Sequence, residues 1–129
     1  MRKPLMLDTC ALLWLASGSE RISNRVRLAI DSAPAVYVSA ISAWEVSLGV
    51  ARKEIDLPMD PLKWFHQAIQ QHNLTLADLT PEVLCRANAL PWHHRDPADR
   101  FIIATANLMR MAIVTADARF AAYGVEVCF

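Results

Sequence analysis

Short apolar segments alternate with helical patterns along the whole chain, and this alternation restricts the fold more than any other feature of the sequence. Strand patterns, mostly apolar or β-branched, are found at 5–7, 35–38, 74–77, 111–115 and 125–128. One or two helical patterns separate each strand from the next, an order typical of parallel strands whose faces are covered by helices. We therefore predict a three-layer α/β fold, in which a central parallel sheet of four to five strands has helices on both faces.

The helices are recognised by apolar residues spaced three and four apart and by residues that begin or end helices. The predicted helices cover 11–16, 22–32, 40–52, 62–72, 80–89, 97–109 and a short segment at 118–121. Apolar residues make up 54% of the 129 residues and charged residues 20%, which is enough apolar material for a buried core. Nothing in the sequence has the composition of a linker, so we expect residues 1–129 to form a single domain.

The charge and cysteine content exclude several classes of protein. The formal net charge is zero, so any contact with nucleic acid must depend on a local basic patch or on metal ions. Cys10, Cys85 and Cys128 lie in apolar surroundings without CxxC spacing, which predicts reduced, packed thiols in a cytoplasmic protein. The segment before Asp8 is too short for a signal-peptide core, and no apolar run is long enough to cross a membrane, so we expect no membrane association.

Four acidic residues occupy positions where a functional site would form in such a sheet. Asp8 and Asp117 each follow a strand pattern, Asp99 lies at the start of an apolar helix, and Glu45 lies on an inward helix face. The carboxyl ends of parallel strands share one edge, so side chains placed there can meet in one crevice. Carboxylates without soft ligands suit a hard cation, and the four acids therefore predict a site for Mg²⁺ or Mn²⁺ with nuclease-like chemistry.

Each acid also has a purely structural interpretation. Asp8 and Asp117 could cap the helices that follow them, since a capping carboxylate accepts a backbone N–H. Asp96 stands directly before a proline, which places it at the N-cap of the helix that contains Asp99, so capping alone explains one of these two acids. Glu45 could instead pair with an arginine. The candidates for that pairing are Arg52, Arg95 and Arg100.

Four short strings follow one another in a characteristic order. They are Asp8-Thr9, Ser42-Ala43-Trp44-Glu45, His94-Arg95-Asp96-Pro97-Ala98-Asp99-Arg100 and Thr115-Ala116-Asp117. This ordered set resembles the PIN domain, and specifically the VapC-type ribonuclease toxins, over nearly the whole chain. One departure is Ala98, where the family usually has a large apolar residue between the two acids. The departure removes no metal ligand.

The resemblance implies a metal-dependent endoribonuclease that cleaves RNA phosphodiester bonds with a metal-activated water and acts as the toxin of a toxin-antitoxin pair. The implied cofactor is Mg²⁺ or Mn²⁺, and the implied partners are an RNA substrate, a cognate VapB-type antitoxin and a second copy of the chain. The implied catalytic and metal-binding acids are Asp8, Glu45, Asp99 and Asp117. The additional or supporting residues are Asp96, Thr9 and Thr115.

Two arginines, Arg95 and Arg100, are the expected contacts to RNA phosphates, because such contacts need local rather than overall positive charge. His93 and His94 are expected on a loop surface and are given no catalytic role. The aromatic residues either fill the core or form an apolar groove for an antitoxin segment or a dimer face. These aromatic residues are Trp14, Trp44, Trp64 and Phe65.

Two other functions remain open. One is a PIN-like scaffold that binds or regulates without catalysis, in which the acids only cap helices. The other takes Asp8 as the nucleophile of a phosphoryl-transfer site of the haloacid-dehalogenase kind, although Cys10 stands where that pattern needs a second Asp. A phosphate-binding P-loop is excluded, because the chain has three glycines and no Gly-Lys-Ser/Thr string.

Overall fold

Five parallel strands form one sheet in the order β3-β2-β1-β4-β5 in the computed structural model, which describes residues 2–129. The strands are β1 (Leu5–Leu7), β2 (Val36–Ser39), β3 (Thr75–Ala77), β4 (Ala112–Val114) and β5 (Val127–Cys128). The helices are α1 (Thr9–Ser17), α2 (Asn24–Ser32), α3 (Ala40–Ala51), α4 (Pro61–Gln71), α5 (Pro81–Ala89), α6 (Pro97–Met109) and the 3₁₀ helix η1 (Ala118–Tyr123). The predicted α/β class and the order of its elements are confirmed.

The three central strands, β2, β1 and β4, pair in register along their whole length. Leu5 is paired with Val36 on one side and with Ala112 on the other. Successive side chains of a strand point to opposite faces. Leu5 and Leu7 therefore join one apolar core and Met6 joins the other. All three residues of β1 are buried, which is why this strand has no polar position.

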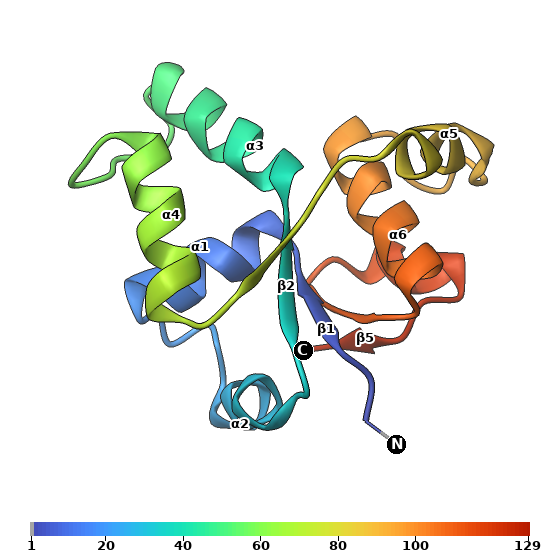
Figure 1. The fold of residues 1–129 in the computed structure, drawn as a ribbon, viewed down its shortest axis with the longest axis horizontal. Coiled ribbons are helices and arrows are strands. Elements are labelled where there is room, and N and C mark those ends of the chain that lie inside the picture. Colours follow the sequence, from blue (N-terminus) through green and yellow to red (C-terminus); the bar gives the residue numbers. More distant parts are fainter. Residues whose placement is uncertain (1) are drawn as a thin grey trace.

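Helices cover both faces of the sheet (Figure 1). α1, α2 and α4 pack over one face and α5, α6 and η1 over the other. The first core includes Leu12, Leu15, Val26, Ile30 and Phe65, and the second includes Val83, Ile102, Ile103, Met111 and Phe120. α3 continues directly from the carboxyl end of β2 and borders both cores, through Ala43 on one side and Ile41 on the other.

Capping side chains explain where the helices begin. The N-caps are Asp8, Ser23, Ser39, Asp60, Thr80, Asp96 and Asp117, and each accepts a backbone N–H from the first turn of its helix. Such caps satisfy amides that have no partner within the helix. Gly18 ends α1 with a φ of 67°, a left-handed conformation that glycine adopts without strain. The predicted capping by Asp8, Asp96 and Asp117 is therefore confirmed.

The cysteines differ from the prediction. All three thiols are free, but Cys10 and Cys85 are exposed, and only Cys128, which is partly buried, packs against the first core. Cys10 is exposed although Thr9 and Ala11 beside it are buried, because successive side chains of a helix point in different directions. The buried face of a helix follows from the helical periodicity, so the number of apolar residues next to a cysteine in the sequence does not predict its burial.

The aromatic residues divide between core and surface. Phe65 is buried, and Trp14 and Trp64 are partly buried against the first core, whereas Trp44 is 57% exposed. Core packing thus accounts for three of these side chains and leaves Trp44 on the surface of α3. Among residues 2–129, no helix has the length and apolar character that crossing a membrane requires.

Candidate active site

The acidic side chains meet at the carboxyl edge of the sheet, where α1 leaves β1 and where η1 follows β4. A pocket of about 350 Å³ opens there, lined from α1, α3, the start of α6 and the segment after β4. Its lining consists of Asp8, Thr9, Cys10, Trp14, Glu45, Asp96, Asp99, Ala116 and Asp117. The four acids that lie far apart in the sequence are thus side by side, as the arrangement of the strand ends predicted.

Asp8 is held from two sides. Its Oδ1 accepts the N–H of Ala11 at 2.8 Å, which caps α1, and its Oδ2 accepts the hydroxyl of Thr115 at 2.5 Å. The side chain is buried, and burial raises the pKa of Asp8 above its ordinary value despite these two hydrogen bonds. The negative charge of Asp117 raises that pKa further. Asp8 therefore caps α1 and lines the acidic pocket at the same time.

Glu45 points from α3 into the pocket and contacts Thr9. The hydroxyl of Thr9 donates to Oε1 of Glu45 and lies 2.8 Å from the hydroxyl of Ser42. No lysine or arginine of the described chain forms an ion pair with Glu45, so the alternative of an arginine partner is excluded. Burial raises the pKa of Glu45, and the charges of Asp96 and Asp8 add to that rise.

Asp96 and Asp99 stand one turn apart at the start of α6. Oδ1 of Asp96 accepts the N–H of Ala98 at 2.9 Å and the N–H of Asp99 at 3.3 Å, which is the predicted cap. Oxygens of Glu45, Asp96 and Asp99 all lie within 4.8 Å of one another. Burial, followed by the charges of the surrounding acids, raises the pKa of Asp99 to about 8. Among residues 2–129, no lysine or arginine pairs with Glu45, Asp96 or Asp99, and such a cluster of like charges suits a bound cation.

Asp117 is the one acid of the pocket that pairs with a lysine or arginine among residues 2–129. Nε of Arg119 donates to Oδ1 at 3.0 Å and Nη2 of Arg119 donates to Oδ2 at 2.8 Å. These bonds hold the pKa of Asp117 at about 2. The Arg119 side chain is 62% exposed, so water screens the pair and its contribution to stability is small.

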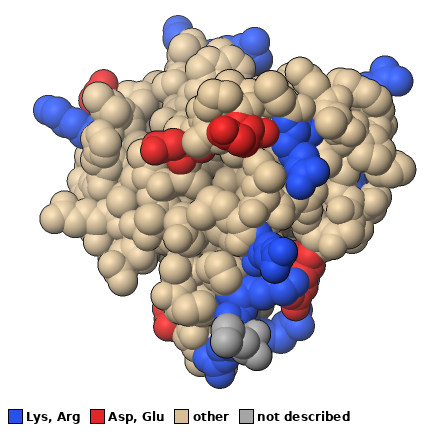
Figure 2. Space-filling view, turned by 45° about the vertical axis from the view of Figure 1, so that its right-hand side comes forward, with Lys and Arg blue, Asp and Glu red and all other residues tan. Residues whose placement is uncertain are grey.

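Several basic side chains gather in a second hollow of the surface, away from the acidic pocket. On the face shown in Figure 2, Lys and Arg gather beside the start of the chain and are otherwise scattered. A hollow of about 480 Å³ lies there, lined by Arg2, Lys3 and Arg25 and by the first residues of β1 and β4. It belongs to the amino edge of the sheet, opposite the acidic pocket. Basic side chains thus gather at this end of the strands, although Glu126 also lines the hollow and Arg119 lies at the acidic pocket.

The sequence profile of the PIN domain family matches residues 5–126. The chain belongs to the PIN domain family. Ribonuclease VapC22 of Mycobacterium tuberculosis (strain ATCC 25618 / H37Rv) is 34% identical to this PIN domain over 116 residues, which make up 89% of this chain and 88% of that protein. The resemblance carried by the four sequence strings is confirmed.

Solved structures have the same fold as this PIN domain. A chain of VapBC2 from Rickettsia felis, bound to a DNA fragment from its promoter, matches with a TM-score of 0.73 and 14% identity over 97% of both chains. A chain of FitAcB from Neisseria gonorrhoeae matches with a TM-score of 0.66 and 24% identity, over 97% of this chain and 96% of that one. The three-layer architecture is therefore that of known PIN domains.

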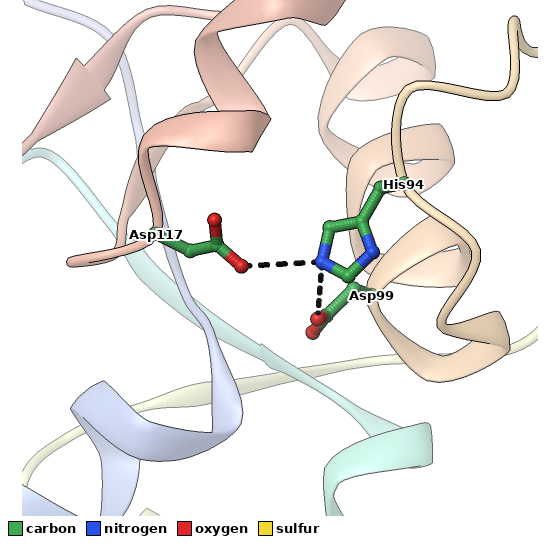
Figure 3. A group of neighbouring side chains, drawn as sticks. All are labelled: His94, Asp99 and Asp117. Carbon is green, nitrogen blue, oxygen red and sulfur yellow. Dashed lines mark hydrogen bonds and ion pairs between the residues drawn. The ribbon is translucent and has the colours of Figure 1, made fainter.

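Two acids of the PIN-domain pocket, Asp99 and Asp117, contact a histidine to which the sequence analysis gave no role. His94 is 2% exposed, and its Nε2 lies 2.8 Å from Oδ2 of Asp99 and 3.2 Å from Oδ2 of Asp117 (Figure 3). The prediction of a loop surface is correct for His93, which is exposed, and wrong for His94. Two adjacent histidines look alike in a sequence, and only the path of the loop distinguishes them.

The predicted RNA contact by Arg100 is wrong. Its guanidinium is buried and donates to the carbonyls of Pro91, His94, Ala87 and Leu90, at 2.6 to 3.0 Å. The carbonyls of Ala87 and Leu90 end α5, where a helix favours a cation. Arg100 therefore fixes the loop that carries His94 and does not reach a substrate.

Proposed function

We propose that this PIN domain is a metal-dependent endoribonuclease that cleaves RNA phosphodiester bonds and acts as the toxin of a toxin-antitoxin pair. The convergence of Asp8, Glu45 and Asp99 in one pocket, with no basic partner for any of them among lysines and arginines 2–129, carries the proposal. The raised pKa values of these three acids mark a pocket that gains stability when a cation enters. The relative VapC22 is named a ribonuclease, which agrees with this assignment.

The ligand atoms of the pocket fit Mg²⁺ or Mn²⁺, because they are carboxylate oxygens, the donors that these hard cations prefer. Asp8, Glu45 and Asp99 would hold the ion, with Asp96 as an additional acid. When bound, such an ion lowers the pKa of water and neutralises charge on a phosphate. Thr9 orients Glu45 and Thr115 orients Asp8 through their hydroxyl groups, so both threonines support the site.

Asp117 would join the metal-binding acids only after its pair with Arg119 opens. Arg119 lies at the surface and can swing from Asp117 to a phosphate of the RNA. Arg95 is also exposed beside the start of α6 and is the second candidate for a phosphate contact. We therefore assign RNA binding to Arg95 and Arg119.

An inactive binding scaffold is the second candidate function. It is favoured by one observation: Asp8, Asp96 and Asp117 each cap a helix, so three of the acids have a structural role without any metal. Capping does not explain Glu45, which caps no helix, or the raised pKa of Asp99. For this reason we favour the enzyme.

We also propose a cognate VapB-type antitoxin, a homodimer and a cytoplasmic location. One solved structure with this fold is named a toxin-antitoxin complex from Klebsiella pneumoniae, and VapBC2 and FitAB were each solved with a DNA fragment. In this chain Trp14 and Trp64 line a mainly apolar hollow of about 500 Å³ between α1 and the segment before α4, and an apolar antitoxin segment could fill it. The free cysteines agree with a reducing compartment.

Cleavage of a labelled single-stranded RNA by the purified chain tests the proposed activity. Cutting should require Mg²⁺ or Mn²⁺ and should stop when EDTA is added. Asp8→Asn and Glu45→Gln should each lower the rate at least about a hundredfold, because they remove charge that the cation needs. Asp31→Asn is the matched control, since Asp31 is exposed on α2. Cleavage that persists in EDTA would refute metal dependence, and a folded chain that binds RNA but never cuts it would support the scaffold.

A further inference from the structure

His94 is fixed in place by contacts on its backbone and its ring. It lies in the loop between α5 and α6, where its N–H donates to the hydroxyl of Tyr123 at 2.7 Å and its carbonyl accepts from Arg100 at 3.0 Å. The imidazole is packed edge-on against Phe120, with 5.7 Å between ring centres. A side chain held in this way presents its ring nitrogens in one direction only.

The hydrogen bonds of the ring identify its tautomer. Nδ1 of His94 accepts the backbone N–H of Asp96 at 3.2 Å, and a backbone amide can only donate. Nδ1 therefore carries no proton, and the ring proton is on Nε2. Figure 3 shows that Nε2 faces the carboxylates of Asp99 and Asp117, to which it donates at 2.8 and 3.2 Å.

This tautomer separates two possible roles. A histidine that binds a metal uses a nitrogen without a proton, because the lone pair forms the bond. In His94 the nitrogen that faces the acids is the protonated one, and the carboxylate oxygens lie at hydrogen-bond distance from it. The ring is consequently a donor to the acids and not a further ligand.

We propose that His94 is a positioning residue, whose Nε2–H holds one oxygen of Asp99 beside one oxygen of Asp117 and thereby sets the orientation of Asp99 toward Glu45. Asp99 belongs to two groups of neighbouring ligand atoms, one with His94 and Asp117 and the other with Glu45 and Asp96. A carboxylate free to rotate would turn away from this concentration of negative charge. The Nε2–H of His94 opposes that rotation. Residues that form hydrogen bonds to metal ligands generally fix the orientation of those ligands in this way.

This inference rests on the proposed function, and two substitutions separate the donor from the rest of the side chain. His94→Gln places an amide nitrogen near the position of Nε2, so it keeps a donor for the acids. His94→Asn places its amide near the position of Nδ1, so it can still accept from Asp96 but cannot reach Asp99. Both variants retain the backbone contacts of residue 94, and circular dichroism verifies that they are folded.

Mn²⁺ binding to the metal-free variants, measured by titration calorimetry, is the deciding experiment. His94→Asn should bind Mn²⁺ about 10–100-fold more weakly than the wild type, and His94→Gln should recover most of the difference. In RNA cleavage, kcat of His94→Asn should fall by a similar factor with KM within a few-fold. Wild-type Mn²⁺ affinity in His94→Asn, or equal losses in both variants, would overturn the proposal.

A second readout needs neither metal nor RNA. Nitrogen NMR of the imidazole in the metal-free wild type should show a proton on Nε2 of His94, and a proton on Nδ1 would overturn the proposal. A wild type that binds Mn²⁺ without cutting RNA would overturn the proposed function and leave His94 to be decided by the two binding measurements. A wild type that binds no Mn²⁺ would overturn both.

Discussion

Glu45 and Asp99 are partly buried carboxylates whose nearest charged neighbours are other acids. A buried carboxylate normally has a basic partner, because removal from water without one costs several kcal/mol. The fold supplies the hydroxyl of Thr9 to Glu45 and the imidazole of His94 to Asp99. These hydrogen bonds stabilise the two acids without a lysine or arginine, and this leaves the carboxylates able to bind a cation.

Glu45→Gln should leave the melting temperature of the metal-free protein unchanged or raise it at pH 8. The substitution removes the repulsion from Asp96 and Asp8 that raises the pKa of Glu45 and keeps a group that can accept from Thr9. Thermal unfolding in EDTA measures the effect, with Asp31→Asn as the surface control. A drop of several degrees in Glu45→Gln alone would mean that the negative charge itself stabilises the fold.

Arg100→Lys should destabilise the protein by about 2–4 kcal/mol, because one ammonium cannot replace a planar guanidinium that bonds to four carbonyls. Arg95→Ala is the comparison: it should weaken RNA binding and change stability by about 0.5 kcal/mol or less, since Arg95 is exposed. Urea unfolding and filter binding of RNA separate the two effects. Equal stability of both variants would contradict the structural role of Arg100.

At the scale of single elements, the start of α6 contains both the acid that caps the helix and an acid of the pocket. Asp96 is the N-cap and accepts two backbone N–H groups with its Oδ1, and Asp99 lies in the first turn that this cap begins. The rest of α6 is buried through Ile102, Ile103 and Ala104, so its start cannot move without disturbing the second core. The helix thus gives Asp99 a rigid support.

Asp96→Ala should lower stability by about 1 kcal/mol through loss of the cap, whereas Asp96→Asn should preserve it, because asparagine caps helices as well as aspartate does. Asp96→Asn should also keep much of the RNA cleavage that Asp99→Asn abolishes. Chemical unfolding and a cleavage assay on all three variants give the comparison. If Asp96→Asn is folded but as inactive as Asp99→Asn, Asp96 is an essential ligand.

The sequence was sufficient for those site residues whose position follows from local structure. Asp8 and Asp117 follow strands, and Asp96 precedes a proline at a helix start, so strand order and capping rules place them. His94 and Arg100 could not be placed in this way. Their loop is shaped by contacts between Arg100 and carbonyls up to thirteen residues away, and no local pattern contains that information.

At the scale of the whole molecule, the acidic pocket makes stability depend on pH. The pKa of Asp99 is about 8 in the folded metal-free protein against 3.8 ordinarily, so folding favours the protonated form. The contribution of Asp99 is fully present below about pH 4 and is lost as the pH rises through 8. Asp117, with its pKa lowered to about 2, contributes in the opposite sense and only in the acid range.

The metal-free protein should therefore be more stable at pH 5 than at pH 8.5, and Asp99→Asn should flatten this dependence. Urea unfolding in EDTA over that range measures it. Mg²⁺ or Mn²⁺ should restore stability mainly at the higher pH, where the acids are ionised and protons compete least with the cation for them. Parallel curves for wild type and Asp99→Asn would show that Asp99 does not titrate in this window.

The capping role of the pocket acids also has a genetic consequence. Asp8, a metal-binding acid in our proposal, begins α1 with a side chain that asparagine can replace at little cost to folding. A single base change in a codon converts aspartate to asparagine. A population that carries this gene is therefore one point mutation away from a folded, silent protein, which could persist as a binding partner after its chemistry is lost.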